Sequence, residues 1–391
     1  MTSSIVQGGK TRQELWSGAV IDCDVHANVP NLQTLFDYQS ELWIQWAEER
    51  GWRGPVGVQD TYPVNAPTST RPEWRPDNGL PATDVSLLQQ HILDPWDVDF
   101  GVLTCYYAID SLRHPDWAAT LASSVNDWVV DQWFTKDPRL VGSIVVPSRD
   151  PIAAAKEIDR VGSHPQFTQV LIPVRSERLL GQRIHHPLYE AMVRNDLVMG
   201  LHWGGTTEEA PSTSGYPSWY VEEYAAETQS YAGQLLSMIA EGVFQKFPDL
   251  RVSFLEGGFS WVPAWCWRMN KEWKGLRREI PWVLEPPLDI VRRHCRFSIA
   301  PTDAGPPEQM TNILRWLGPD NLLMFATDYP HRHDDDLATL LEVMPAEHRA
   351  QMMAETAREW YRLGPGPSRT AGAGRLIAKL RPAALREDYL P

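Results

Sequence analysis

Eight short apolar or β-branched runs, separated by segments of helical length, are the feature that most constrains how this chain can fold. Such alternation is typical of a parallel α/β fold and not of separate β and α domains. Eight units at this spacing favour a closed (β/α)₈ barrel, the TIM barrel, over an open doubly wound sheet. The predicted strands are Ala19–His26, Val102–Tyr107, Val141–Pro147, Gln169–Val174, Val198–Trp203, Val252–Gly257, Arg296–Ala300 and Leu322–Asp328.

Segments with a helical pattern follow nearly all of these strands. They bury one apolar stripe against the barrel and leave a polar face outside. The predicted helices are Trp117–Phe134, Ile152–Val161, Pro187–Asn195, Tyr231–Phe247, Trp261–Trp273, Pro307–Trp316 and Leu337–Met344.

Two connections are longer than the barrel pattern requires. An insertion over about residues 30–99 separates the first two strands, and residues 204–230 separate the fifth strand from its helix. Loops of this length in a compact domain tend to be lids or binding loops. Gly, Pro, Ser, Arg and Ala dominate about residues 364–391, which predicts a C-terminal tail. The sequence thus predicts one domain over residues 1–391, with an insertion at the catalytic mouth.

Charge and cysteine usage narrow the choice of partner and compartment. With 36 Lys and Arg against 50 Asp and Glu, the formal net charge is −14. Nucleic acid or an anionic membrane would need a basic surface, so a small-molecule substrate is expected. No secretory signal or membrane span is evident, which predicts a cytoplasmic protein. The four cysteines are far apart, form no CxxC pair and are predicted to be reduced, mostly buried thiols.

The first strand carries three polar residues at alternate positions. A period of two places Asp22, Asp24 and His26 on one face of the strand. Facing a barrel interior, these groups need a partner, and a bound cation would satisfy them. The alternative is a strand edge with solvated charges.

Two further polar residues stand where predicted strands end. His202 closes the fifth strand before Gly204 and Gly205, and Asp328 closes the eighth. Active-site residues of barrels come from these strand ends. Two carboxylates and two imidazoles meeting there would form a nitrogen and oxygen site suited to Zn²⁺, Mn²⁺ or Fe²⁺. A structural histidine and a helix-capping aspartate are the alternatives.

Glu256 ends the sixth strand and is followed by two glycines. It is expected to point into the same mouth, either as a general base for water or as a group that orients a ligating histidine. An ion pair with a nearby arginine is the alternative.

Substrate-binding candidates lie in the neighbouring loops. Arg175 could grip a carboxylate, or could instead pair with a surface acid. Trp203, Tyr216 and Trp219 could form walls for an aromatic substrate, with core packing as the alternative. Among His185, His186, His331 and His333, we rank His331 first as an acid or base and expect most of the others to be surface histidines.

Taken together, four anchors resemble a known family. These are Asp22–His26, His202–Gly204, the segment from Phe247 through Glu256 to Gly258, and Ala326–His331. They are similar to the amidohydrolase-related family that includes amino-carboxymuconate-semialdehyde decarboxylase and the resorcylate and carboxyvanillate decarboxylases. Each anchor alone is weakly specific, but they occur in family order and span most of the chain.

The resemblance implies a barrel with one divalent metal ion, Zn²⁺ or Mn²⁺, held by Asp24, His26, His202 and Asp328. It also implies a homodimer. Where the family often has a His-x-His pair on the first strand, this chain has Asp24 first, and a harder donor makes Mn²⁺ as credible as Zn²⁺. Where the decarboxylases usually carry a histidine after the sixth strand, this chain has Glu256.

The second departure decides the functional prediction. Glutamate can accept a proton from a metal-bound water, as Asp328 also can, and the activated water can then attack a carbonyl group. We therefore predict a hydrolase that acts on a small cyclic or aromatic carboxylate, with His331 as a further acid or base. Non-oxidative decarboxylation of an aromatic or dienoic acid is the alternative. A barrel that binds a ligand without turnover is a third hypothesis.

Overall fold

The computed structural model is a parallel eight-stranded barrel, which confirms the predicted TIM-barrel class. It describes residues 5–7, 10–55, 69–205, 210, 212, 214–318, 321–333 and 335–367. In the strand order β10-β9-β8-β7-β6-β5-β4-β3, each strand pairs with the strand that precedes or follows it in the chain, and every pairing is parallel. The strands are β3 (Ile21–His26), β4 (Phe100–Thr104), β5 (Leu140–Val145), β6 (Phe167–Pro173), β7 (Val198–His202), β8 (Val252–Leu255), β9 (Cys295–Ser298) and β10 (Leu323–Met324).

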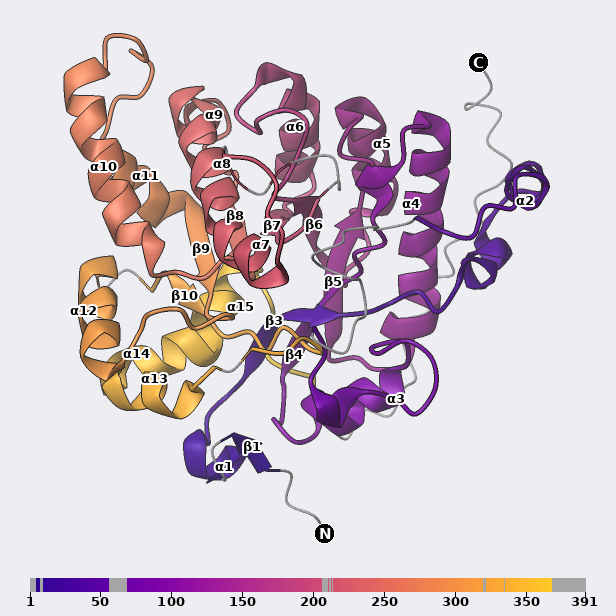
Figure 1. Cartoon of the computed structure of the whole chain (residues 1–391), viewed down its shortest axis with the longest axis horizontal. Helices are drawn as coiled ribbons and strands as arrows, with labels where there is room; N and C mark the ends of the chain where they lie inside the picture. Colours follow the sequence, from indigo (N-terminus) through magenta and orange to yellow (C-terminus); the bar gives the residue numbers. More distant parts are fainter. Residues whose placement is uncertain are drawn as a thin grey trace.

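These strands form because their runs are apolar on both faces. Nearly every strand residue is buried, as expected when helices cover a parallel sheet from outside. The covering helices surround the sheet in Figure 1. They include α4 (Pro115–Val129), α5 (Pro151–Val161), α6 (His186–Arg194), α8 (Thr228–Ala240), α10 (Trp261–Leu276), α11 (Pro287–His294), α12 (Pro307–Leu317) and α13 (Leu337–Val343).

The seam between the first and last strands differs from the prediction. The eighth strand was expected to run to Asp328, but β10 ends at Met324. Beyond it, Cys23 N–H donates to the Phe325 carbonyl at 2.9 Å, and His26 N–H donates to the Tyr329 carbonyl at 2.8 Å. The Asp22 carboxylate accepts the amide of Thr327 at 3.0 Å and its hydroxyl at 2.6 Å. A side chain therefore takes the place of ladder hydrogen bonds where the barrel closes.

Two helix predictions were wrong in detail. The segment expected as one helix over Tyr231–Phe247 is divided into α8 and α9 (Val243–Lys246) at Gly242, whose φ of 74° only glycine adopts easily. The segment after β4 becomes a π-helix over Val130–Phe134 at the end of α4. The sequence analysis also missed α2 (Glu41–Glu49), in the insertion, and α11.

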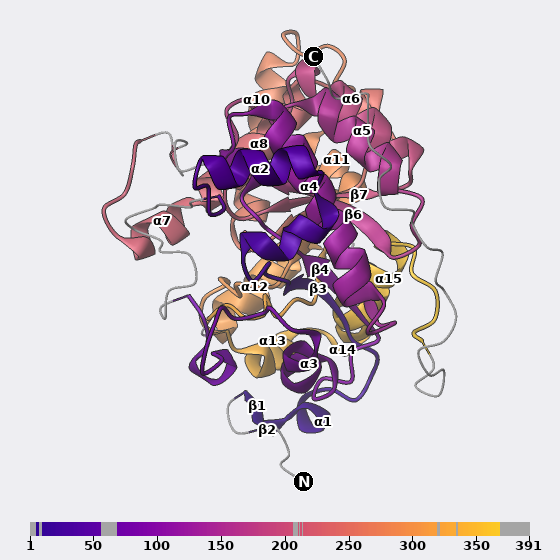
Figure 2. The same ribbon diagram turned by 90° about the vertical axis from the view of Figure 1, so that its right-hand side faces the viewer.

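The two ends of the barrel are covered by different elements. At the carboxyl ends of the strands, α7 (Tyr220–Ala226) lies in front of the sheet in Figure 1 and projects from one side in Figure 2. At the opposite end lies α15 (Thr356–Trp360), the last described helix. The predicted tail over about 364–391 falls outside the described residues from 368 onward, and the single-domain organisation stays a prediction.

Two smaller findings concern the rest of the described chain. All four cysteines are free and buried, as predicted. In the described part of the chain, no helix is long and apolar enough to cross a membrane.

Candidate metal centre

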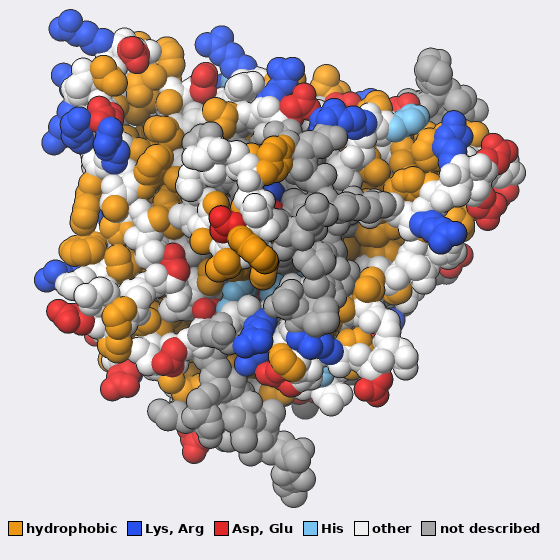
Figure 3. Space-filling view, in the orientation of Figure 1, with side chains coloured by type: hydrophobic (Ala, Val, Ile, Leu, Met, Phe, Trp, Pro, Cys, Tyr) orange, Lys and Arg blue, Asp and Glu red, His pale blue; other side chains and the backbone are white. Residues whose placement is uncertain are grey.

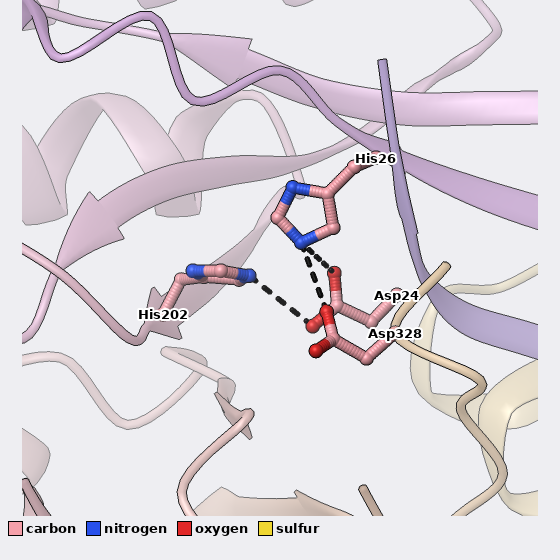
Figure 4. A group of neighbouring side chains, drawn as sticks. All are labelled: Asp24, His26, His202 and Asp328. Carbon is pink, nitrogen blue, oxygen red and sulfur yellow. Dashed lines mark hydrogen bonds and ion pairs between the residues drawn. The ribbon is translucent and has the colours of Figure 1, made fainter. Parts of the chain in front are cut away.

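The structure brings the four predicted ligands together at one end of the barrel. Asp24 and His26 lie on β3, His202 ends β7, and Asp328 follows β10. One ligand atom from each lies within 4.8 Å of the others, and all four residues are buried. Figure 4 shows these side chains converging from β3, from the end of β7 and from the segment after β10.

The shortest contacts join imidazoles to carboxylates. His26 Nε2 lies 2.9 Å from Asp328 Oδ1 and 3.8 Å from Asp24 Oδ1. His202 Nε2 lies 3.2 Å from Asp24 Oδ2, while its Nδ1 is 2.8 Å from the carbonyl oxygen of Trp203. The backbone contact orients the His202 ring and leaves Nε2 facing the carboxylates, as expected for a metal-ligating histidine.

Buried polar atoms at this point lack ordinary partners. Both carboxylate oxygens of Asp24, Nε2 of His202 and Oε2 of Glu256 are buried and accept or donate no hydrogen bond among the described residues. Unpaired buried polar atoms are rare and costly in proteins. A divalent cation would satisfy those of Asp24 and His202, so the residues present fit a metal ion.

The charges at the centre are those that a cation would balance. Burial would lower the pKa of His202, but the carboxylates of Asp24, Glu256 and Asp328 raise it to about 10. Burial would raise the pKa of Asp328, but His331, His26 and His333 hold it well below its usual range. The carboxylates at the centre therefore favour neighbouring positive charge, which a metal ion supplies.

Asp22 does not face the metal centre as its place in the alternating pattern predicted. It was expected to share a face, and a cation, with Asp24 and His26. Its partner is instead the backbone and side chain of Thr327, at the barrel seam. Burial raises its pKa to about 7, although the Thr327 hydrogen bonds lower it. The register between β3 and β4 shifts between Asp22 and Val25, so simple alternation does not describe this strand.

Glu256 lies beside the ligands, directly after β8. Its backbone has a φ of 56°, a left-handed conformation that is uncommon for glutamate. Oε1 accepts a hydrogen bond from the Tyr224 hydroxyl at 2.9 Å, and Oε2 lies 3.7 Å from His202 Nε2. Burial and the Asp328 charge raise its pKa to about 7. The arginine partner considered from sequence is not among the described contacts of Glu256.

Two histidines converge on one oxygen of Asp328. His331 Nδ1 lies 3.1 Å from Asp328 Oδ2, and His333 Nε2 lies 2.5 Å from the same atom. The His333 side chain is 6% exposed, so the expectation of a surface histidine was wrong for this residue. The alternation His331-x-His333 after Asp328 was the available signal.

The predicted substrate-binding residues are placed very differently from one another. Trp203 is buried next to His202. Arg175 is also buried, and its guanidinium faces Glu223 and Glu227, which are themselves buried and not surface acids. Tyr216 and Trp219 are 64% and 71% exposed. A contact of any of them with substrate stays a prediction.

Sequence reasoning missed two aromatic residues of the site. Tyr106 stacks on the His202 ring, with centroids 6.4 Å apart, and the Tyr224 hydroxyl donates a hydrogen bond to Glu256 Oε1. Tyr106 follows a strand and offered a positional signal. Tyr224 lies in a long connection and offered none.

A cavity of about 330 Å³ reaches the two histidines. The insertion contributes Arg71, Trp74 and His91 to its wall, which also includes His331 and His333 but none of the four metal-ligand candidates. Its size lies at the lower end of the roughly 300–1,000 Å³ typical of small-molecule sites. In Figure 3, histidine side chains are visible in a hollow near the centre of this face.

Comparisons with known proteins relate this chain to a family of enzymes. The amidohydrolase family model matches residues 21–363. A γ-resorcylate decarboxylase of Rhodococcus jostii is 23% identical over 265 residues, which cover 63% of this chain and 78% of that protein.

Solved structures of similar fold include 5-carboxyvanillate decarboxylase from Sphingomonas paucimobilis, with a TM-score of 0.62 and 18% identity, covering 89% of this chain and 100% of the other. A dihydroxybenzoic acid decarboxylase from Polaromonas, solved with manganese and the inhibitor 2-nitroresorcinol, has a TM-score of 0.62 and 17% identity, covering 89% and 98%. At these identities the structural likeness shows the fold.

Proposed function

Since the chain belongs to the amidohydrolase family and is a metal-dependent enzyme, we propose that it is a non-oxidative decarboxylase of hydroxylated aromatic acids. This reverses the order of the two reactions considered from sequence, where hydrolysis came first. The decarboxylase relatives support the change.

The observation that carries the proposal is the pair of imidazoles on Asp328 Oδ2, at the wall of the cavity. Decarboxylation of an arene needs an acid that protonates a ring carbon, whereas hydrolysis needs a base that activates water. Burial lowers the pKa of His331, but Asp328 and Glu256 raise it above its ordinary value. His331 is therefore suited to hold a proton beside a substrate in the cavity.

The residue roles follow from these contacts. Asp24, His26, His202 and Asp328 would hold one divalent cation, Mn²⁺ or Zn²⁺, which when bound supplies Lewis-acid charge for the substrate carboxylate and an adjacent oxygen. Asp328 Oδ2 accepts the Nδ1 proton of His331 and so fixes the ring, leaving Nε2 to carry the transferable proton.

The proton balance of the step is simple. The ring carbon that bears the carboxylate takes the proton from His331. The bond from that carbon to the carboxylate then breaks, its electron pair restores the aromatic ring, and CO₂ leaves. His331 regains a proton from solvent. Trp74, in the cavity wall, offers an aromatic surface for the ring.

The test uses the Mn²⁺-loaded protein in D₂O with 2,6-dihydroxybenzoate and 5-carboxyvanillate, the acids suggested by the relatives' names. We expect CO₂ release and one deuterium at the ring carbon that carried the carboxylate, detected by NMR. His331→Asn should lose turnover while keeping its metal. The proposal fails if no aromatic acid releases CO₂.

Hydrolysis is the second candidate, and one observation favours it. Oε2 of Glu256 is buried, makes no hydrogen bond to a described residue, and lies among the ligands, as a general base would. Incorporation of ¹⁸O from labelled water into the product of an ester or amide, without CO₂, would establish this reaction. In both cases the partner is a small molecule, and a homodimer stays a prediction.

A further inference from the structure

Helix α7 places one tyrosine between Glu256 and His333 at the metal centre. We propose that Arg175 anchors α7 to the barrel mouth and that Tyr224, on this helix, is a positioning residue that fixes Glu256 and His333. The part that concerns turnover rests on the proposed function. The anchoring and the hydrogen bonding do not.

The anchor is a buried arginine with two carboxylates. Arg175 Nη1 lies 3.1 Å from Glu223 Oε1, and its Nε lies 3.4 Å from Glu227 Oε2. All three side chains are at most 3% exposed. Glu223 belongs to α7, and Glu227 lies between α7 and α8, so the two contacts hold the helix and its C-terminal end. Ion pairs removed from water depend on both partners, because an unpaired buried charge is costly.

The position of Arg175 explains why glycine occupies position 205, after β7. Its amide donates to the carbonyl of Gly204 at 3.0 Å. A Cβ atom added at Gly205 would lie 2.4 Å from the Cβ of Arg175, and Gly205 has a φ of 148°. Only glycine permits this approach. The end of β7 is therefore shaped to admit Arg175 under α7, and not merely to be flexible.

Aromatic packing continues from the anchor to the tyrosine. The guanidinium carbon of Arg175 lies 5.7 Å from the Trp203 ring centroid, and the Trp203 and Tyr224 rings are 5.8 Å apart. A displacement of Arg175 would therefore change the packing of Trp203 against Tyr224. This arrangement gives Trp203 a role in packing α7, whatever its contact with substrate.

The hydroxyl of Tyr224 completes a hydrogen-bonded chain. It donates to Glu256 Oε1 at 2.9 Å and lies 3.1 Å from His333 Nδ1. With the hydroxyl proton directed to Glu256, a proton on His333 Nδ1 would be donated to the Tyr224 oxygen. The same oxygen lies 3.4 Å from His333 Nε2, which lies 2.5 Å from Asp328 Oδ2. Tyr224 therefore links Glu256 to Asp328 without being a ligand.

Two variants separate the tyrosine from its anchor. Tyr224→Phe removes one oxygen atom and keeps the ring packing. We expect kcat to fall about 10–100-fold, as for other groups that orient a metal site, with KM and metal content little changed. The matched control is Tyr38→Phe, since that hydroxyl also donates to a carboxylate, at 2.8 Å from Asp131 Oδ2, but lies outside the site.

Two readouts do not depend on turnover. In Zn²⁺-loaded protein labelled with ¹⁵N-histidine, the His333 Nδ1 proton should exchange with water faster in Tyr224→Phe than in wild type or Tyr38→Phe. His333→Gln assigns the signal. For Arg175→Gln, amide hydrogen exchange over residues 220–226 should accelerate at least about tenfold, reflecting local opening. Tyr224→Phe should leave this exchange unchanged.

The outcomes are distinct. If Arg175→Gln does not fold, Glu223→Gln replaces it, because Arg175 keeps Glu227. The double variant of Arg175 and Tyr224 should lose no more kcat than the worse single variant, within about twofold, if Arg175 acts through Tyr224. Unchanged exchange of the His333 proton and of α7 would overturn the inference. Absence of turnover in wild type would instead overturn the proposed function alone.

Discussion

Two clusters of buried polar side chains, one at each end of the barrel, differ in how their members are paired. At the end covered by α15, Trp360 Nε1 donates to Ser253 Oγ at 3.1 Å, and the Tyr361 hydroxyl lies 3.0 Å from the same oxygen. Tyr361 donates to Gln169 Oε1 at 2.9 Å, and Gln169 Nε2 donates to Ser143 Oγ at 2.8 Å. Each of these contacts is an ordinary hydrogen bond.

At the mouth, several buried polar atoms of Asp24, His202 and Glu256 have no hydrogen-bond partner among the described residues. Local rules of polar satisfaction are broken mainly where a protein binds or reacts. We infer that the hydrogen-bonded cluster under α15 contributes stability and that the cluster at the mouth contributes function. The predictions below test this division.

The largest effect should come from removing a carboxylate at the mouth. Asp24→Asn should abolish stoichiometric metal binding and lower kcat/KM by roughly 10³-fold, about 4 kcal/mol. In metal-free protein it should change the free energy of unfolding little, because the cost of burying the Asp24 charge offsets its 3.2 Å ion pair with His202. Elemental analysis and urea unfolding measure the two quantities. A metal-free variant that is markedly less stable than metal-free wild type would contradict the division.

A second carboxylate at the mouth, that of Asp110 after β4, should make the free energy of unfolding depend on pH. Burial raises its pKa from 3.8 to about 6, although hydrogen bonds from Ser148 lower it. Between these values the folded protein binds more protons than the unfolded chain. Stability should therefore fall as pH rises from about 4 to about 6, by at most about 3 kcal/mol from this group.

Asp110→Asn should remove this contribution and become relatively more stable above pH 6. Urea unfolding of both metal-free proteins at pH 4.5 and 7.5 checks it. An equal pH dependence in both would show that the Asp110 carboxyl does not titrate as inferred.

At the opposite end, Tyr361→Phe should reduce stability without changing activity. The lost hydroxyl leaves Ser253 and Gln169 short of partners, which should cost about 1–3 kcal/mol in the free energy of unfolding. Metal content and kcat should match wild type, since α15 lies away from the mouth. A fall in kcat at unchanged metal content would show that the two ends are coupled.

The smallest effect on stability is expected at the exposed rim of the mouth. Trp219 is 71% exposed, so Trp219→Ala should change the free energy of unfolding by less than about 0.5 kcal/mol. If Trp219 contacts substrate, as the sequence predicts, KM rises while kcat holds. An unchanged KM removes it from the binding residues.

Much of the architecture was predictable because its signals are local. Strands such as β7 are continuous apolar runs, and their polar last residues stand out against them. His26, His202 and Asp328 could be selected in this way, since every parallel strand of a barrel ends at the same face. Asp24 was selected by its alternation with His26 on the first strand. The family resemblance then assigned them a common metal ion.

Local patterns also misled where a side chain replaced the backbone. Alternation grouped Asp22 with Asp24, but Asp22 reaches across the seam to Thr327, and β10 ends early for the same reason. Nothing in the spacing of either residue records a contact between positions about 300 residues apart.

The sequence by itself determined the barrel, the strand ends and the four candidate ligands, because periodicity and strand-end polarity are properties of short segments. Only the tertiary structure decided that Arg175 faces Glu223 and Glu227, that His333 is buried against Asp328, and that Tyr224 joins His333 to Glu256. These contacts depend on how a long connection folds back over the mouth. Their energies come from burial and from partners distant in sequence, which no local pattern encodes.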